Sequence, residues 1–402
     1  AGTTMGELMI LSEKAGGFNR QSQENDNKLG LYIHIPFCKS KCYYCDFFSF
    51  AGREDAIYPY FQALKNEIES YKGVLENYRI GTVFIGGGTP SVVNAIYIRE
   101  LINNIRMHFN IDPGAEISIE ANPGTLSFDK LAAYLDAGVN RLSIGMQAWQ
   151  DRLLESIGRI HRSGEFVENF KLARKAGFTN INVDLIFGLP GQTFDDWAET
   201  INSVIELDPS HISCYSLKIE DGTVFGDMLR EGKLKPIEDE LDRQMYHFAI
   251  ERLAEHGFLH YEISNFSKPG FECRHNLVYW EGRQYIGLGA GAHSYFNGKR
   301  YNNVCDLDSY INCGARMQFH KENIEEIDIN EQISEYIILG LRLIRGVSAD
   351  KFKLKFGRDI FDLFGEQIDN LISRGLLEFK DGTLRLTKSG LDLANQVFIE
   401  FV

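Results

Sequence analysis

Three cysteines near the start of the chain are the residues best able to do chemistry. Cys38, Cys42 and Cys45 have the spacing C-x₃-C-x₂-C within LYIHIPFCKSKCYYCDFFSF, residues 31–50. A four-iron, four-sulfur cluster has four corner irons, so full cysteine ligation takes four thiolates. Three thiolates leave one iron open, and S-adenosylmethionine (SAM) can chelate it through its amino and carboxylate groups. An electron from the cluster would then break a carbon–sulfur bond of SAM and release a 5′-deoxyadenosyl radical.

Two simpler interpretations of the three cysteines stay open. Zinc accepts a set of three cysteines and one histidine, which would make the chain a zinc-stabilised, non-catalytic binding protein. Zinc sites usually bring paired cysteine knuckles, however, and no second C-x₂-C pair occurs in the chain. The cysteines could also be buried small hydrophobic residues. The strand-like YIHI before Cys38 and the aromatic Tyr44 before Cys45 favour the cluster.

Charge and cysteine usage limit the possible partners and compartment. The chain has 402 residues, with 42 Lys and Arg against 56 Asp and Glu, and a net charge of −14. An acidic chain is a poor binder of a phosphate backbone, so we expect no nucleic-acid partner. The four cysteines outside the loop are scattered, which indicates free thiols in a reducing cytoplasm. They are Cys214, Cys273, Cys305 and Cys313.

The rest of the composition bears on membranes and on the N-terminus. The sequence has no apolar run approaching the ~18 residues that a membrane span needs. Residues 1–29 are polar, with the stretch QSQENDN, and we expect a disordered leader or an expression remnant.

Short apolar segments alternate with segments of helical periodicity over the first half of the chain. Besides the strand before the cysteines, strands are expected at 82–90, 116–124, 141–147, 180–191 and 211–219. Such alternation predicts a parallel sheet with both faces covered. Six units predict a partial (β/α)₆ TIM-like barrel, because a full barrel has eight. We assign residues 30–225 to this barrel and 226–325 to an extension of it.

Polar and glycine residues recur where these strands end. They lie in the stretches Gly86–Pro90, Glu120–Pro123, Gly145–Gln147 and Asp184–Gly191. In barrels of this kind the carboxyl ends of the strands carry the functional site. Glycine and proline alone would be ordinary turn residues, but Glu120, Gln147 and Asp184 accompany them. The sequence therefore predicts a binding site shared by the cysteine loop and these strand ends.

Six motifs together resemble one branch of the radical SAM superfamily. They are YIHIPFCKSKCYYCDF, FIGGGTPS, IEANPG, RLSIGMQ, GRIHR and VDLIFGLPGQ. This branch contains oxygen-independent coproporphyrinogen III oxidase (HemN) and the haem chaperone HemW, and the resemblance runs from about residue 30 to the end. It implies a [4Fe-4S] cluster held by Cys38, Cys42 and Cys45, and an electron donor such as flavodoxin or ferredoxin.

The resemblance also assigns residues to the SAM pocket. It implies that Tyr32 lies against SAM, that Tyr44 packs near its adenine and that Glu120 makes polar contacts with it. The backbone from Gly87 through Gly88 to Thr89 would meet the methionyl amino group. Three further residues match positions that line SAM sites in the oxidase, namely Gln147, Arg159 and Asp184.

Two features distinguish the chaperone from the oxidase. The oxidase pattern has an extra cysteine two residues after the third, where this chain has Phe47. The segment HNLVYW, residues 275–280, resembles the chaperone signature. The resemblance thus implies a cytoplasmic protein that binds haem and delivers it to acceptor proteins. Oxidative decarboxylation of coproporphyrinogen III in haem biosynthesis is the alternative, and a homodimer is left open.

The HNLVYW segment is the candidate haem surface. Imidazole is a standard ligand of haem iron, so His275 could contact haem, with Tyr279 and Trp280 against the porphyrin face. Alternatively, His275 has a structural role and the aromatic residues belong to the core. The nearby G-x-G-x-G run at 287–291 has no following Rossmann helix and acidic residue at the right distance, which argues against nucleotide binding there.

The composition changes at about residue 329. An amphipathic helix, NEQISEYIILGLRLIRG at 330–346, is followed by helical segments near 349–356 and 359–373, and by a hairpin with Asp381 and Gly382 at its turn. A last helix closes the chain. This order predicts a winged-helix-like α+β module over 326–402. Because no basic recognition helix is present, a docking or lid role is expected rather than DNA binding.

Overall fold

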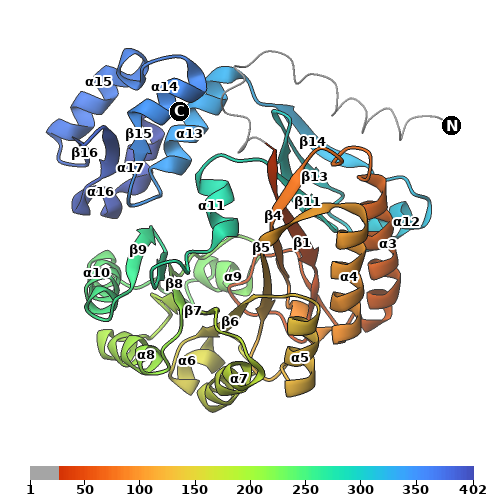
Figure 1. Ribbon diagram of the computed structural model, residues 1–402. Helices are drawn as coiled ribbons and strands as arrows, with labels where there is room; N and C mark the ends of the chain where they lie inside the picture. The colour runs from red at the N-terminus through yellow and green to blue at the C-terminus, as the bar shows by residue number, and fades with distance from the viewer. Residues whose placement is uncertain (1–26) are drawn as a thin grey trace.

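The computed structural model describes residues 27–402 (Figure 1). The expected leader falls outside this range except for its last three residues, and Lys28 and Leu29 already belong to the first strand, β1 (Lys28–Ile35). Within the described residues no helix is long and apolar enough to cross a membrane.

The described chain forms one large curved sheet around which the rest is arranged (Figure 1). Its strand order is β14-β13-β12-β11-β1-β4-β5-β6-β7-β8-β10-β9. The six expected strands are neighbours and run parallel, which confirms the partial barrel. After β1 they are β4 (Arg79–Gly87), β5 (Asn110–Ala121), β6 (Arg141–Gln147), β7 (Ile181–Phe187) and β8 (His211–Ser216).

Amphipathic helices connect these strands and cover the outer face of the sheet (Figure 1). The strands are nearly continuous apolar runs because both of their faces are covered. In β6, six of the seven residues are buried. The helices are α3 (Ile57–Ser70), α4 (Ala95–His108), α5 (Phe128–Asp136), α6 (Asp151–Ser156), α7 (Ser163–Ala176) and α8 (Phe194–Glu206).

A further strand extends the parallel sheet beyond the six that were expected. β11 (Tyr285–Leu288) runs parallel to β1 on the side away from β4. The glycines of the G-x-G-x-G run permit close packing at its end. A side chain on Gly287 would lie 2.2 Å from the His293 oxygen, and one on Gly289 would lie 2.5 Å from the Tyr60 hydroxyl. These glycines therefore let β11 and the following turn fit against their neighbours.

Antiparallel strands complete the sheet at both edges. Beyond β11 lie β12 (His293–Phe296), β13 (Lys299–Asn303) and β14 (Lys321–Glu326), with α12 (Leu307–Ala315) between the last two. Beyond β8 lie β10 (Asn265–Ser267) and β9 (Leu259–Glu262). The helices of this second half of the barrel are α9 (Val224–Arg230), α10 (Asp239–Glu255) and α11 (Arg274–Trp280).

The C-terminal segment packs around a hydrophobic core of its own. This core runs from Ile333 to Phe401. Three short strands, β15 (Val347–Ser348), β16 (Leu377–Lys380) and β17 (Thr383–Leu386), form a small antiparallel sheet. The helices are α13 (Ile329–Gly340), α14 (Ala349–Phe356), α15 (Ile360–Ser373), α16 (Lys388–Asp392) and α17 (Ala394–Ile399). The expected hairpin turn is present, since Asp381 and Gly382 both have positive φ.

Polar contacts fix this module to the barrel. The Asp392 carboxylate lies 3.2 Å from Arg243 Nη1 and 2.9 Å from His247 Nε2, both on α10. The segment after α13 pairs with the end of β9, where Leu343 forms a β-bridge with Glu262. The module thus covers one side of the barrel opening, where α16 and α17 contribute to a large cavity.

Candidate functional site

A cavity of about 1260 Å³ lies between the strand ends, the cysteine loop and the C-terminal module. Of the thirteen residues that the sequence assigns to a site, eleven line it. They are Cys38, Cys42, Tyr44, Cys45, Gly87, Gly88, Thr89, Glu120, Gln147, Arg159 and Asp184. The structure therefore brings together residues from all six motifs, and it leaves Tyr32 and His275 outside the cavity wall.

The three thiols share one part of this wall. Burial raises the pKa of Cys38 and of Cys45, and the other thiols raise it further, so the sulfurs lie within electrostatic reach of one another. The Thr89 hydroxyl donates to Cys38 Sγ at 3.6 Å, and Arg159 Nη1 donates to Cys42 Sγ at 3.5 Å. In residues 27–402 no three His, Cys, Asp or Glu side chains are arranged to hold a single metal ion.

The loop that carries the thiols is anchored at both ends. Two short strands, β2 (Phe37–Cys38) and β3 (Phe50–Ala51), pair in parallel where it leaves and returns. His34 Nε2 is hydrogen-bonded to the Phe48 carbonyl at 2.7 Å, and the Tyr43 N–H donates to the Ile157 carbonyl. The fold therefore sets the position of the cysteines at the end of β1.

The glycine loop after β4 presents backbone to the cavity. Gly87 has φ of +109°, and a Cβ there would lie 2.5 Å from the His34 ring. A Cβ on Gly88 would lie 2.8 Å from the Phe37 carbonyl. The N–H groups of Gly87, Gly88 and Thr89 donate to Glu120, Ile35 and Phe37, respectively. A ligand amino group would therefore meet carbonyl oxygens here rather than N–H donors.

Glu120 is a cavity carboxyl with a raised pKa. It lies at the end of β5, and its Oε2 accepts from the Gly87 N–H at 3.1 Å. Burial, and then the nearby Asp184, raise the pKa of Glu120 to about 8, against a weaker lowering effect of the Gly87 N–H. A ligand amino group beside this carboxyl would favour its ionised form.

The raised pKa predicts how stability depends on pH. A carboxyl whose pKa is higher in the folded state binds its proton more tightly there. Its contribution is fully present below the unfolded value of 4.5 and is lost as the pH rises through about 8. We expect this loss to reach about 3 kcal/mol in the ligand-free protein and to vanish in Glu120→Gln. Unfolding free energies at pH 5 and pH 8.5 test this, and equal pH dependence in both proteins would contradict it.

Arg159 and Asp184 organise the polar floor of the cavity. Arg159 Nη2 donates to Asn122 Oδ1 at 2.7 Å and to the Gly145 carbonyl at 2.6 Å, which aims the guanidinium at the cysteine loop. Asp184 accepts from the Ser143 hydroxyl and from Asn182 Nδ2, each at 2.8 Å. Both charges are thus held in place before any ligand arrives.

Tyr32 and His275 lie beside the cavity wall rather than on it. The Tyr32 hydroxyl is hydrogen-bonded to His34 Nδ1 at 3.0 Å. His275 is buried, with Nδ1 bonded to Thr82 Oγ1 at 2.8 Å and Nε2 bonded to the Tyr279 hydroxyl at 2.9 Å. Burial lowers the pKa of His275 to about 3, so the ring stays neutral. Both of its nitrogens are in use in this structure.

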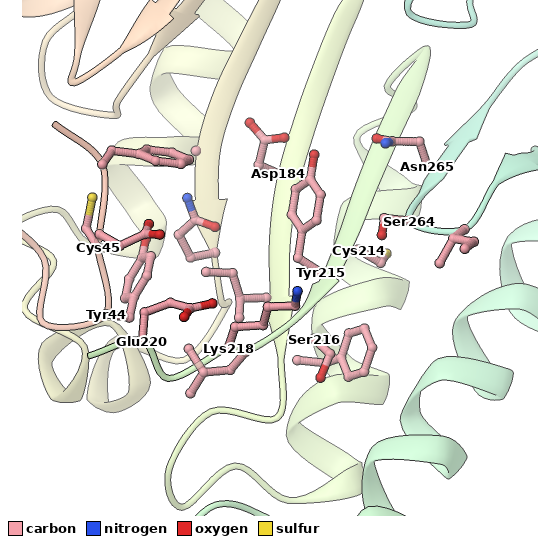
Figure 2. A pocket seen from close by; sticks show the side chains of 18 of the residues that line it. Tyr44, Cys45, Asp184, Cys214, Tyr215, Ser216, Lys218, Glu220, Ser264 and Asn265 are labelled. Carbon is pink, nitrogen blue, oxygen red and sulfur yellow. The ribbon is translucent and has the colours of Figure 1, made fainter. Parts of the chain in front are cut away.

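One wall of the cavity had no counterpart among the predicted site residues. Figure 2 shows Tyr44 and Cys45 on one side of this pocket and Asn265 on the other, with Asp184 and Tyr215 between them. Further lining comes from the C-terminal module, at 391–396 and Phe398. Tyr215, Asn265 and the lining residues of the module are far apart in the sequence and share no motif, so only the folded chain reveals them.

Comparison with known proteins identifies the family. The model of the radical SAM superfamily matches residues 32–204, and that of the HemN C-terminal domain matches residues 327–393. A curated relative named heme chaperone HemW from Bacillus subtilis (strain 168) is 40% identical over 374 residues, which cover 92% of this chain and 98% of the relative. This chain belongs to the HemW family of radical SAM proteins. A HemW from Escherichia coli (strain K12) is 32% identical, over 93% of this chain and 98% of the relative.

A solved structure supports the fold of this HemW family member. Coproporphyrinogen III oxidase (HemN) from Escherichia coli, described as a radical SAM enzyme, superposes with a TM-score of 0.81 over 94% of this chain and 90% of its own. The two sequences are 24% identical, so this likeness establishes the shared fold alone. It confirms the barrel with its C-terminal module, and membership of the radical SAM superfamily implies a [4Fe-4S] cluster and SAM.

Proposed function

We propose that the protein is a haem chaperone that binds a [4Fe-4S] cluster, SAM and haem, and that delivers haem to acceptor proteins. The observation that carries this proposal is the close similarity over almost the full length to relatives named heme chaperone HemW. The cavity supports it, because one space of about 1260 Å³ is lined by the cysteine loop, by strand-end polar residues and by aromatic side chains.

The residues of the cavity fit the cluster and SAM. Cys38, Cys42 and Cys45 would hold the cluster. Three thiolates ligate three of its four irons and leave the fourth iron open. Arg159 next to Cys42 Sγ supplies positive charge to the thiolates. The carbonyl groups of Gly87–Thr89 and the Glu120 carboxyl would bind the amino group of SAM, with Gln147, Asp184 and Tyr44 around the remainder. When bound, the cluster and SAM together supply one-electron chemistry.

Phe47 separates the proposed activity from that of an oxidase. It occupies the place where the oxidase pattern has an additional cysteine, it lines the cavity, and 60% of its surface is exposed. A phenyl ring neither ligates a metal nor transfers a proton, so a step that needs this thiol is closed to the chain. An exposed aromatic ring at the cavity suits contact with a flat ligand instead.

The HNLVYW segment forms part of the proposed haem site. Asn276, Tyr279 and Trp280 line the cavity, whereas His275 links this helix to β4 through Thr82 and is hydrogen-bonded to Tyr279 within the helix. A haem contact by His275 stays a prediction, and it would require the ring to exchange one of its two hydrogen bonds for the ligand.

The remaining parts of the proposal concern organisation and partners. We place the protein in the cytoplasm, with a flavodoxin- or ferredoxin-like electron donor and with haem acceptor proteins as partners, without nucleic acid, and we leave a homodimer open. We keep the division into barrel (30–225), extension (226–325) and C-terminal module (326–402). The extension supplies the six strands β9 to β14 at the two edges of the large sheet, and the module has a separate core.

Haem titration of the anaerobically reconstituted protein tests the proposal. We expect saturable binding of about one haem per chain, seen as a shift in the visible absorption of haem, with the cluster intact. If the visible absorption of haem did not change when the protein was added, the proposal would be contradicted. The same titration of His275→Ala locates the ligand: an altered haem spectrum supports contact by His275, and an unchanged one places the haem on other residues.

A further inference from the structure

Five buried polar atoms on residues that line the cavity find no hydrogen-bond partner within residues 27–402. One is Nε of Arg159, in the part assigned to the cluster and SAM, and the other four are Glu262 Oε2, Asn265 Oδ1, Trp280 Nε1 and Arg342 Nε. Buried polar groups are normally paired, because an unpaired one costs about 1–3 kcal/mol. Four such atoms on residues that line one cavity indicate a place where a ligand completes the hydrogen bonds.

Arg342 is the unusual member of this group. In the described part of the chain its guanidinium forms no hydrogen bond or ion pair, although the protein carries a net charge of −14. It lies over the Trp280 ring, 4.4 Å from the ring centroid. The neighbouring Arg345, by contrast, forms an ion pair with Glu281. The Glu262 carboxyl lies within electrostatic reach of Arg342, but burial raises the pKa of that carboxyl. A cation that is held against an aromatic ring without a hydrogen-bonded anion suits an anionic ligand.

The backbone around these side chains is fixed. The Ile263 N–H donates to the Arg342 carbonyl at 3.1 Å, and Glu262 forms a β-bridge with Leu343. Glu262 Oε1 accepts from the Ser264 N–H at 3.2 Å and from Asn265 Nδ2, which leaves Oε2 as its unpaired oxygen. The four side chains come from three parts of the fold: the β9–β10 hairpin, α11 and the segment that follows α13 in the C-terminal module. Their groups are therefore positioned before a ligand binds.

The donors in this group match a carboxylate. Arg342 and Trp280 each offer an N–H, and a guanidinium binds carboxylates in a planar, charge-assisted geometry. Burial raises the pKa of Glu262, so its carboxyl retains a proton more readily and Oε2 can donate as well. None of these residues belongs to the cysteine loop or to the strand ends assigned to SAM.

We propose that Arg342 and Trp280, with Glu262 beside them, form a subsite that binds a propionate carboxylate of haem. This proposal rests on the proposed function. It places the propionate side of haem at the interface between the barrel and the C-terminal module, so that both parts of the protein contact the same ligand.

Comparison of haem with its dimethyl ester tests the subsite, because the ester keeps the macrocycle and lacks both carboxylates. On the reconstituted protein, we expect haem to bind at least about tenfold more tightly than the ester. The ester cannot form the charge-assisted hydrogen bond to Arg342, and the loss of one such bond corresponds to a factor of this size. The Arg342→Gln protein should bind haem and the ester equally, with the affinity that the native protein has for the ester. Trp280→Phe keeps the ring and should lose about threefold for haem alone. Arg345→Gln, a nearby arginine outside the cavity, should match the native protein.

The possible outcomes separate this proposal from the chaperone function. Equal affinity of the native protein for haem and ester, or undiminished discrimination in Arg342→Gln, would overturn the subsite and leave haem binding standing. If Arg342→Gln loses SAM affinity and keeps its preference for haem, the recognised carboxylate belongs to SAM and the propionate assignment is wrong. If the native protein binds neither haem nor ester, the proposed function fails and the subsite fails with it.

Discussion

Replacement of Cys42 by alanine is expected to remove most of the iron and sulfide that the native protein takes up on anaerobic reconstitution. When only two thiolates remain, a second iron of the cluster has no protein ligand, in addition to the iron left open for SAM. Solvent can then attack the cluster at that second iron. Cys42 Sγ is also the atom that Arg159 contacts at 3.5 Å, so the substitution leaves that buried cation without its anionic partner. Iron and sulfide analysis, together with the visible absorption, measures the effect.

A matched control separates cluster loss from general damage to the protein. Cys305 is an exposed free thiol that does not line the cavity, so Cys305→Ala should reconstitute like the native chain. Far-ultraviolet circular dichroism of the cluster-free proteins should be the same for both variants. Four irons per chain in the triple variant of Cys38, Cys42 and Cys45 would show that the cluster assignment is wrong.

Substitution of valine for Gly87 is expected to lower SAM affinity more than about a hundredfold. The residue has φ of +109°, a conformation that a β-branched residue disfavours strongly. Its added Cβ would also lie 2.5 Å from the His34 ring, so the turn that presents carbonyl groups to SAM must move. Equilibrium binding of SAM to cluster-loaded protein measures the change, with iron content determined on the same sample.

Gly52 provides the control for backbone strain alone. It has φ of +72°, and a Cβ there meets no atom within 4 Å. Gly52→Val carries a similar conformational cost without crowding, and it should bind SAM as tightly as the native protein does. A Gly87→Val protein that binds SAM within threefold of the native affinity would contradict the placement of SAM against this loop.

The local parts of the architecture could be predicted from the sequence. Strand β6 has the bounds that were expected from RLSIGMQ, because a short, nearly continuous apolar run between turns is a local signal. The turn at Asp381 and Gly382 has a specific local chemistry in the same way. The cysteine spacing, the strand-end residues and the resemblance to a known family together located eleven of the cavity residues.

The features that depend on distant contacts could not be predicted. Strand β11 is only four residues long, and no strand that pairs with β1 was expected there. His275 was a candidate haem ligand by residue type, but burial against Thr82 and Tyr279 is decided by packing. Arg342 contacts Trp280 where the C-terminal module packs against the barrel, and no local sequence pattern predicts this interface.

An anaerobic assay of coproporphyrinogen III conversion tests the central claim most directly. One sample of reconstituted protein, shown to bind haem, is supplied with SAM, a reductant and coproporphyrinogen III, and the porphyrin products are separated. With Phe47 in place of the oxidase cysteine, we predict haem binding without formation of protoporphyrinogen IX. Formation of protoporphyrinogen IX at rates typical of enzymes, about one per second or faster, would contradict the account.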